Sequence, residues 1–241
     1  MIPFKRRALL GFNTNAKTIK GEKIGFYTGI LYLAPSDLSG FNVCGMAKLA
    51  KCEKPCLYTA GRGAFNSIQL ARISKTQYYF NDRNNFMINI YKDIEKGIKK
   101  AKTLNQELLI RLNGTSDIRF ENVSFVHNGI EYANIMEAFP NVQFYDYTKY
   151  TNRDTLPVNY DLTFSYSGAD TFTKYNNIAI TKGYRIATVF RYEKNIPSIF
   201  QGIKVIAGDN SDVRHIEEKN TIVALYAKGK AVKDTSGFVV G

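Results

Sequence analysis

Short apolar runs recur along this chain and alternate with segments of helical pattern. The expected strands are residues 24–33, 108–112, 141–145, 160–164, 184–190, 204–207 and 221–225. The expected helices are residues 64–80, a segment after Asp82, residues 130–139 and a helical turn within 168–177. Short buried strands that alternate with helices are typical of parallel α/β folds. The pattern therefore predicts a parallel α/β barrel, complete or partial, with an open doubly wound sheet as the alternative.

Length and composition are those of a globular protein. A chain of 241 residues with 44% hydrophobic residues can bury a large core. No sequence repeat or boundary divides it, so we expect a single α/β domain over residues 1–241. No run of 18 apolar residues occurs, which predicts no membrane span. The N-terminus is a poor signal peptide, and an odd cysteine count argues against a disulfide framework. We expect a cytoplasmic protein.

Polar residues follow several of the expected strands. Ligands bind at the carboxyl ends of strands in parallel sheets and barrels. The common occurrence of Asn and Gly in turns accounts for these two residue types after the strands. It accounts less well for the repeated Asp and Thr. We therefore expect a ligand pocket at these ends, lined by Asn113, Thr115, Asp117, Asp146, Lys149, Ser165 and Asp209.

Three of these side chains are candidate catalytic residues. Asp117 and Asp146 are candidate acids or bases, and Lys149 is a candidate anion-binding group. Arg62 is a second candidate for anion binding. No nucleotide-binding, hydrolase or zinc-protease motif occurs in the chain.

All three cysteines of the chain, Cys44, Cys52 and Cys56, lie within thirteen residues. Their loop, residues 38–63, follows the first expected strand and precedes a helix. Clustered thiolates favour zinc, copper(I) or an iron–sulfur cluster. A structural zinc site normally has four ligands, and the two histidines, His127 and His215, are far away in sequence.

An iron–sulfur cluster is therefore the favoured prediction. A [4Fe–4S] cluster on three cysteines has one open iron position, whereas a [3Fe–4S] cluster needs three ligands only. Zinc is the alternative, and a third interpretation is that the cysteines are small buried apolar residues. The lysines, Gly45 and Pro55 of the loop argue against this third interpretation.

The net charge of +12 lies almost entirely in the first half of the chain. Residues 1–110 hold 18 Lys and Arg against 7 Asp and Glu, a net charge of +11. Such a field attracts polyanions and steers anionic ligands. It predicts either a nucleic-acid partner for this basic half or a small anionic ligand near the cluster. A solvated lysine-rich surface is the plainer interpretation.

Several segments resemble a known family. They are Leu38–Cys44, Cys56–Gly63, Arg111–Asp117, Val142–Lys149 and Ser236–Val240. Together they are similar to the bacteriophage "gene product eighty-eight" family, over a region from Leu38 to the end. The resemblance implies a phage-encoded protein that works in the host cytoplasm, and it implies no defined activity. The family pattern has an aromatic residue soon after the first cysteine, where this chain has Gly45 and Met46.

A weaker similarity is to radical S-adenosylmethionine enzymes, which place three cysteines after the first strand of a partial barrel. Their usual spacing is C-x3-C-x2-C, and this chain has C-x7-C-x3-C. The similarity implies that Asn113–Asp117 bind the methionine amine and that Ser165 and Ser167 lie near the ribose. It places Ile206–Asn210 near the adenine, and it makes S-adenosylmethionine a candidate cofactor.

The leading expectation is thus a phage iron–sulfur protein with redox or radical chemistry at one open iron position. The alternatives are a basic nucleic-acid-binding protein and a host-modulating protein, each with a structural zinc site.

Overall fold

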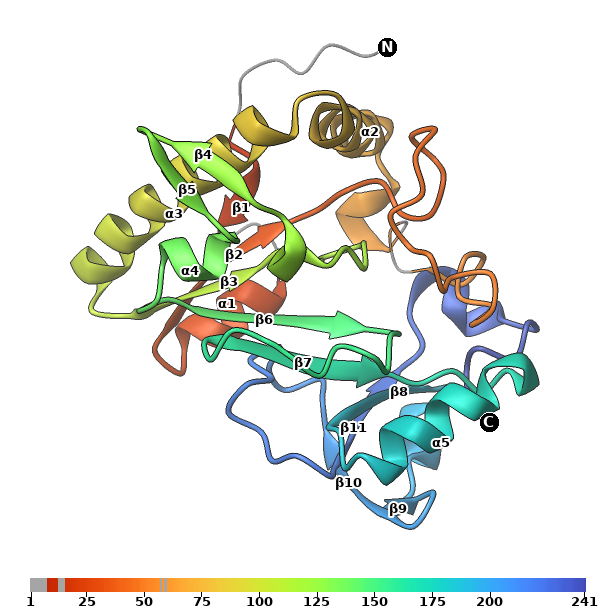
Figure 1. Cartoon of the computed structure of the whole chain (residues 1–241). Helices are drawn as coiled ribbons and strands as arrows, with labels where there is room; N and C mark the ends of the chain where they lie inside the picture. The colour runs from red at the N-terminus through yellow and green to blue at the C-terminus, as the bar shows by residue number, and fades with distance from the viewer. Residues whose placement is uncertain (1–7, 13–15, 57, 59) are drawn as a thin grey trace.

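A nine-stranded, mostly parallel sheet runs through the molecule in a computed structural model that describes residues 8–12, 16–56, 58 and 60–241 (Figure 1). Its strands are β1 (Leu10–Phe12), β2 (Phe26–Leu31), β3 (Glu107–Arg111), β6 (Gln143–Thr148), β7 (Tyr160–Ser165), β8 (Ile186–Phe190), β9 (Ile199–Phe200), β10 (Ile203–Ala207) and β11 (Ile222–Tyr226). The spatial order is β1-β2-β3-β6-β7-β8-β11-β10-β9, and only the two end strands run antiparallel to their neighbours.

The described α-helices are α1 (Ala16–Glu22), α2 (Asn66–Asn81), α3 (Arg83–Leu104), α4 (Ile135–Ala138) and α5 (Thr173–Thr181). Short 3₁₀ helices are η2 (Gly61–Ala64), η3 (Phe120–Asn122), η4 (Asp170–Phe172), η5 (Glu193–Asn195) and η6 (Gly229–Lys233). A separate hairpin consists of β4 (Phe125–His127) and β5 (Ile130–Tyr132). None of the helices in the described part of the chain is long and apolar enough to cross a membrane.

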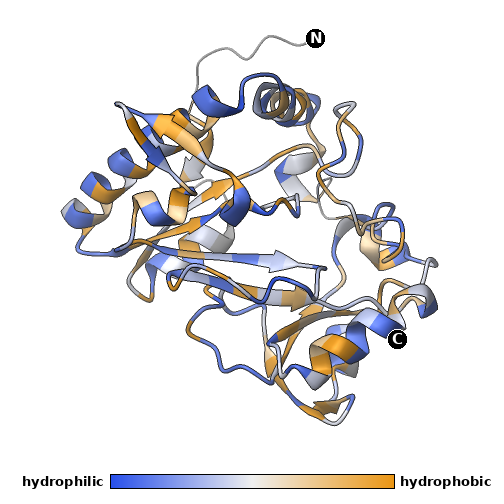
Figure 2. Cartoon of the chain, in the orientation of Figure 1, coloured by the Kyte–Doolittle hydropathy of each residue, from blue (hydrophilic) through white to orange (hydrophobic). Residues whose placement is uncertain are grey.

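Helix α3 forms because its sequence is amphipathic and its ends are capped. Phe86, Ile90 and Ile94 recur at helical spacing and are fully buried. Hydrophobic and hydrophilic colours alternate along this helix in Figure 2, as expected for one buried and one exposed face. Asp82 accepts a hydrogen bond from the amide of Asn85 at the start, and Asn105 adopts a left-handed conformation at the end.

Helices α3, α4 and α5 cover one face of the sheet. Leu108, Ile110 and Phe144 pack with residues of α3 and α4. Leu162 packs against the same core, and Phe164, two residues further on β7, packs with Phe172 and Ala179 beside α5. Side chains two apart on a strand share a face. The spatial order of the strands repeats the chain order from β2 through β3, β6 and β7 to β8. The helices that connect these strands lie on that one face.

The last parallel strands reverse this order. Strand β11 lies between β8 and β10, so the chain moves backwards from β10 to β11. The connecting segment 208–221 crosses the opposite face, where Val213 packs with Leu109 and Tyr145. A right-handed crossover changes face when the direction of strand order changes, which explains this placement.

The predicted strands are confirmed within a few residues, and so are the helices at 64–80 and after Asp82. The prediction of a helix over residues 130–139 is wrong in its first half, because residues 130–132 form β5. Asn128 and Gly129 both have positive φ and form the tight turn between β4 and β5. The sequence analysis also missed β1, α1 and β9.

Candidate functional site

The cysteine loop lies beside the carboxyl ends of β3, β6 and β7 (Figure 1). On its β3 side it is fixed by the segment that follows that strand. The amide of Asp117 donates to the Val43 carbonyl at 2.8 Å, and the Thr115 hydroxyl donates to the Leu33 carbonyl at 2.5 Å. The Cys44 thiol lies 3.7 Å from the Thr115 carbonyl. The first cysteine is therefore held against the end of β3.

Three hydroxyl groups hold the other side of the loop. They contact the carbonyl oxygens of three consecutive residues, Leu49, Ala50 and Lys51. Thr171 Oγ1 and Ser167 Oγ each donate across 2.7 Å, to Leu49 and Ala50, and Ser236 Oγ lies 2.9 Å from the Lys51 oxygen. Segments after β7 and at the C-terminus thus determine the course of the loop before Cys52.

Lys149, directly after β6, is buried beside this loop. Its ammonium donates to the carbonyl and hydroxyl of Ser165 at 2.9 and 3.0 Å, and it lies 4.9 Å from the centre of the Phe238 ring. Burial lowers the pKa of Lys149, whereas the three thiols and Asp117 raise it. All three cysteines are thus near enough to one ammonium group to act on its pKa.

Burial raises the pKa of all three thiols, that of Cys44 to about 12. Cys52 and Cys56 also raise the pKa of Cys44, and Cys52 raises that of Cys56. Among the described residues, however, no three Cys, His, Asp or Glu side chains are close enough to hold a single metal ion. The side chains of the described residues therefore do not form a preassembled zinc site.

Asp117 connects the ends of β3 and β6. Its carboxylate accepts a hydrogen bond from the backbone amide of Lys149 at 2.8 Å and lies 3.4 Å from the Arg153 guanidinium. Burial raises the pKa of Asp117, against the effect of these partners. Arg153 also pairs with Glu121 at 2.6 Å. Asp117 is thus a positioning group for the Lys149 backbone.

The sequence matches the Gene product 88 family over residues 6–241. The chain belongs to this family. The bacteriophage family predicted from its motifs is therefore confirmed. Comparisons with curated proteins and with solved structures give no match. Neither supports the similarity to radical S-adenosylmethionine enzymes.

Asp146 occupies the centre of the polar groups in this Gene product 88 chain. It is 1% exposed and accepts hydrogen bonds from the amides of Leu112 and Asn113, the Asn113 side chain and the Tyr160 hydroxyl, at 2.7 to 3.3 Å. Burial raises its pKa to about 6, while Arg111 and these hydrogen bonds oppose the rise. Asp146 joins β3, β6 and β7 below the cysteine loop.

Asn113 shapes the turn after β3. Its side-chain oxygen accepts hydrogen bonds from the Ser116 hydroxyl and the Ile118 amide at 2.8 Å. Its side-chain NH₂ group donates to the Ile118 carbonyl at 2.9 Å. The structure thus brings Asn113, Thr115, Asp117 and Asp146 to one end of the sheet, together with Lys149, Ser165 and Ser167. Most of their polar atoms hold neighbouring chain segments in place.

Two predicted residues form no contact with the other site residues that the structure shows. Asp209 pairs with Lys228 and accepts from the Tyr226 amide, at the ends of β10 and β11. Arg62 is exposed on η2. The sequence analysis did not single out Arg153, Ser236 or Phe238 as site residues. The only signal for the last two was their place in the family motif Ser236–Val240.

Proposed function

We propose that Cys44, Cys52 and Cys56 bind an iron–sulfur cluster, with one iron left open. The observation that carries the proposal is one loop that bears all three cysteines beside the strand ends, next to the buried Lys149, whose pKa all three thiols raise. Thiolate-ligated clusters carry net negative charge, and a buried charge needs a partner of opposite sign. Lys149 supplies that partner within the fold.

The elements around the loop favour a cluster over a single zinc ion. Zinc takes four ligands at about 2.0–2.3 Å in a structural site. The described residues hold no group of three or more Cys, His, Asp and Glu side chains that could bind a metal ion, so no fourth zinc ligand accompanies the cysteines there. A [4Fe–4S] cluster held by three thiolates keeps one iron open, and a [3Fe–4S] cluster is the second choice.

When bound, the cluster supplies redox or radical chemistry, with the hard step carried by the cofactor. The chain itself contributes orientation and shielding. Ser167 and Thr171 fix the loop, Lys149 holds a positive charge beside the sulfurs, and Phe238 covers that charge. A small anionic ligand at the open iron, or S-adenosylmethionine as a cofactor there, belongs to this proposal.

The proposal also covers the domain architecture of the protein and its location in the cell. A single mostly parallel sheet supports one α/β domain, and only its five strands in chain order, from β2 to β8, are comparable with a partial α/β barrel. The bacteriophage family supports work in the host cytoplasm.

The proposal is tested by anaerobic reconstitution of the full chain with iron and sulfide. We expect a brown protein with the broad visible absorption of a thiolate-ligated cluster, which is lost in Cys52→Ser. Ser67→Ala, an exposed serine at the start of α2, is the matched control and keeps the colour. Equal colour in wild type and Cys52→Ser contradicts the proposal.

The alternative of nucleic-acid binding through residues 1–110 does not correspond to one surface. The basic residues of this half lie partly on α3 and partly on the cysteine loop, which occupy opposite sides of the molecule in Figure 1. Lysines 92, 96, 99, 100 and 102 belong to α3, whereas 48, 51 and 54 belong to the loop.

A further inference from the structure

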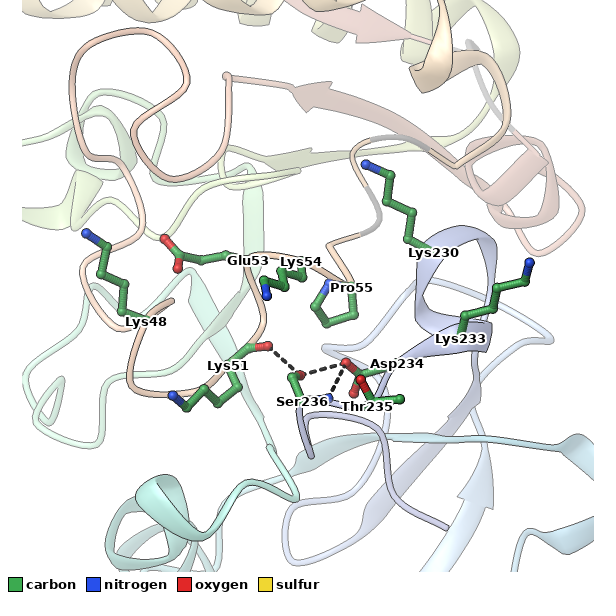
Figure 3. Close-up of a pocket in the computed structure, with 10 residues that line it drawn as sticks. All are labelled: Lys48, Lys51, Glu53, Lys54, Pro55, Lys230, Lys233, Asp234, Thr235 and Ser236. Carbon is green, nitrogen blue, oxygen red and sulfur yellow. Dashed lines mark hydrogen bonds between the residues drawn. The ribbon is translucent and has the colours of Figure 1, made fainter.

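A pocket of about 650 Å³ opens where the cysteine loop meets the C-terminal segment (Figure 3). We call it the lysine pocket, because five lysines line it: Lys48, Lys51, Lys54, Lys230 and Lys233. The first three belong to the cysteine loop and the last two to η6. The sequence analysis grouped the loop lysines with the basic first half and did not connect them with Lys230 and Lys233.

The two walls of the lysine pocket are tied together. The Ser236 hydroxyl lies 2.9 Å from the Lys51 carbonyl and 2.6 Å from the Asp234 carboxylate. Asp234 is buried and also accepts from the amides of Ser236 and Val239, each at 3.0 Å. The lysines are therefore presented by two segments that are fixed relative to each other.

Five lysines against two acidic residues give the lining of the pocket a net charge of +3. Its only two acidic lining residues are Glu53 and Asp234. Glu53 accepts a hydrogen bond from the Ser36 hydroxyl at 2.6 Å, and Asp234 accepts hydrogen bonds from the amides of Ser236 and Val239. Within the described part of the chain, none of the five lysines forms an ion pair with a carboxylate. A net positive charge around a pocket attracts an anionic ligand.

The arrangement of the lysines indicates the shape of that ligand. A 3₁₀ helix has about three residues per turn, so Lys230 and Lys233 lie on the same side of η6. In Figure 3 these two stand on one side of the pocket and Lys48 and Lys51 on the other, with Lys54 between them. The lysines thus stand on both sides and in the middle of the pocket, and this spread suits an extended chain of phosphates better than one compact anion.

The residue type indicates how the ligand is recognised. Lysine acts on a phosphate as a point charge, without the fixed two-pronged geometry of arginine. Phosphate contacts position a nucleic acid but carry no sequence information. We propose that the lysine pocket binds the phosphate backbone of a single-stranded nucleic acid without sequence preference. This inference is independent of the metal bound by the cysteines.

The test measures binding of two labelled single-stranded DNA oligonucleotides of about 20 nucleotides and different sequence, at a series of salt concentrations, to the full chain. Lys230→Ala/Lys233→Ala removes two lysines of the pocket and leaves the cysteine loop sequence intact. Lys99→Ala/Lys100→Ala, on the exposed face of α3, removes the same charge elsewhere. We expect equal affinity for the two sequences.

Loss of two phosphate contacts reduces the salt slope by about 1.4 and weakens binding about 10- to 30-fold at 0.1 M salt. The α3 variant should retain wild-type affinity within about twofold, and Lys230→Arg/Lys233→Arg should retain binding. Equal weakening in the η6 and α3 alanine variants overturns the proposal. So does a wild-type chain that binds ATP but neither oligonucleotide.

Discussion

The backbone amide of Lys149 donates a hydrogen bond to Asp117 across 2.8 Å. This contact joins the ends of β3 and β6, and it fixes the backbone from which the Lys149 side chain extends beside the cysteines. The amide of Asp117 in turn donates to Val43, just before Cys44. Two adjacent strand ends and the cysteine loop are thereby connected through one carboxylate residue.

Lys149→Met removes the positive charge near the thiols and keeps a side chain of similar length. We expect the variant to fold, because burial of the ammonium is itself unfavourable. Its cluster content after reconstitution should fall several-fold, since the negative cluster loses its charged partner. Iron and sulfide analysis of the reconstituted protein measures this effect.

Lys149→Arg is the control for charge and should retain more cluster than Lys149→Met. A Lys149→Met protein with the wild-type content of iron and sulfide would show that the ammonium has no part in binding.

Asp146→Asn should destabilise the fold. The carboxylate accepts hydrogen bonds at both oxygens, so an amide places an NH₂ group opposite a donor. We expect a loss of about 2 kcal/mol in the free energy of unfolding, measured by urea denaturation. Asp170→Asn, on an exposed residue of η4, is the control and should leave this free energy unchanged. Equal stability of wild type and Asp146→Asn contradicts this role for Asp146.

The same residue predicts a dependence of stability on pH. Its pKa is about 6 in the folded protein and about 4 in an unfolded chain. The folded state therefore binds the proton more tightly, and the contribution of Asp146 to stability falls as pH rises from about 4 to about 6. Above that range the contribution is constant.

The fall amounts to at most about 3 kcal/mol for a shift of two units. Urea unfolding at several pH values measures it, and the difference between wild type and Asp146→Asn isolates the part due to this residue. A difference that does not vary between pH 4 and 7 would contradict the raised pKa of Asp146.

Ser167→Ala separates two roles for this serine. The similarity to radical enzymes implies a place near a ribose, whereas the structure shows its hydroxyl bonded to the Ala50 carbonyl. If the contact with the loop is its role, the variant loses about 1 kcal/mol of stability and retains cluster poorly. Unchanged unfolding and unchanged cluster content, with weaker S-adenosylmethionine binding in a titration, would favour the ribose role.

The meeting of Asn113, Asp117, Asp146 and Lys149 could be predicted from sequence. Parallel strands expose their carboxyl ends at one edge, so polar residues that follow successive strands come together. The same reasoning misplaced Asp209, because the reversal of β10 and β11 depends on long-range strand order that no local pattern records. Asp209 consequently pairs with Lys228 instead of facing the cysteines.

The lysine pocket and the hairpin β4–β5 show two other limits. Lys51 and Lys233 line the same pocket although they are far apart in sequence, and charge counts by halves of the chain hide that relationship. The segment 130–139 has apolar residues at helical spacing, but the turn at Asn128 and Gly129 directs its start into a strand. Turn residues were a stronger signal there than periodicity.

The central claim is that the three cysteines hold an iron–sulfur cluster, and metal analysis of the anaerobically purified chain tests it most directly. We predict iron and acid-labile sulfide in nearly equal amounts, little zinc, and loss of both iron and sulfide when Cys44, Cys52 and Cys56 are replaced by serine. One zinc ion per chain without sulfide, lost in the same variant, would contradict the claim.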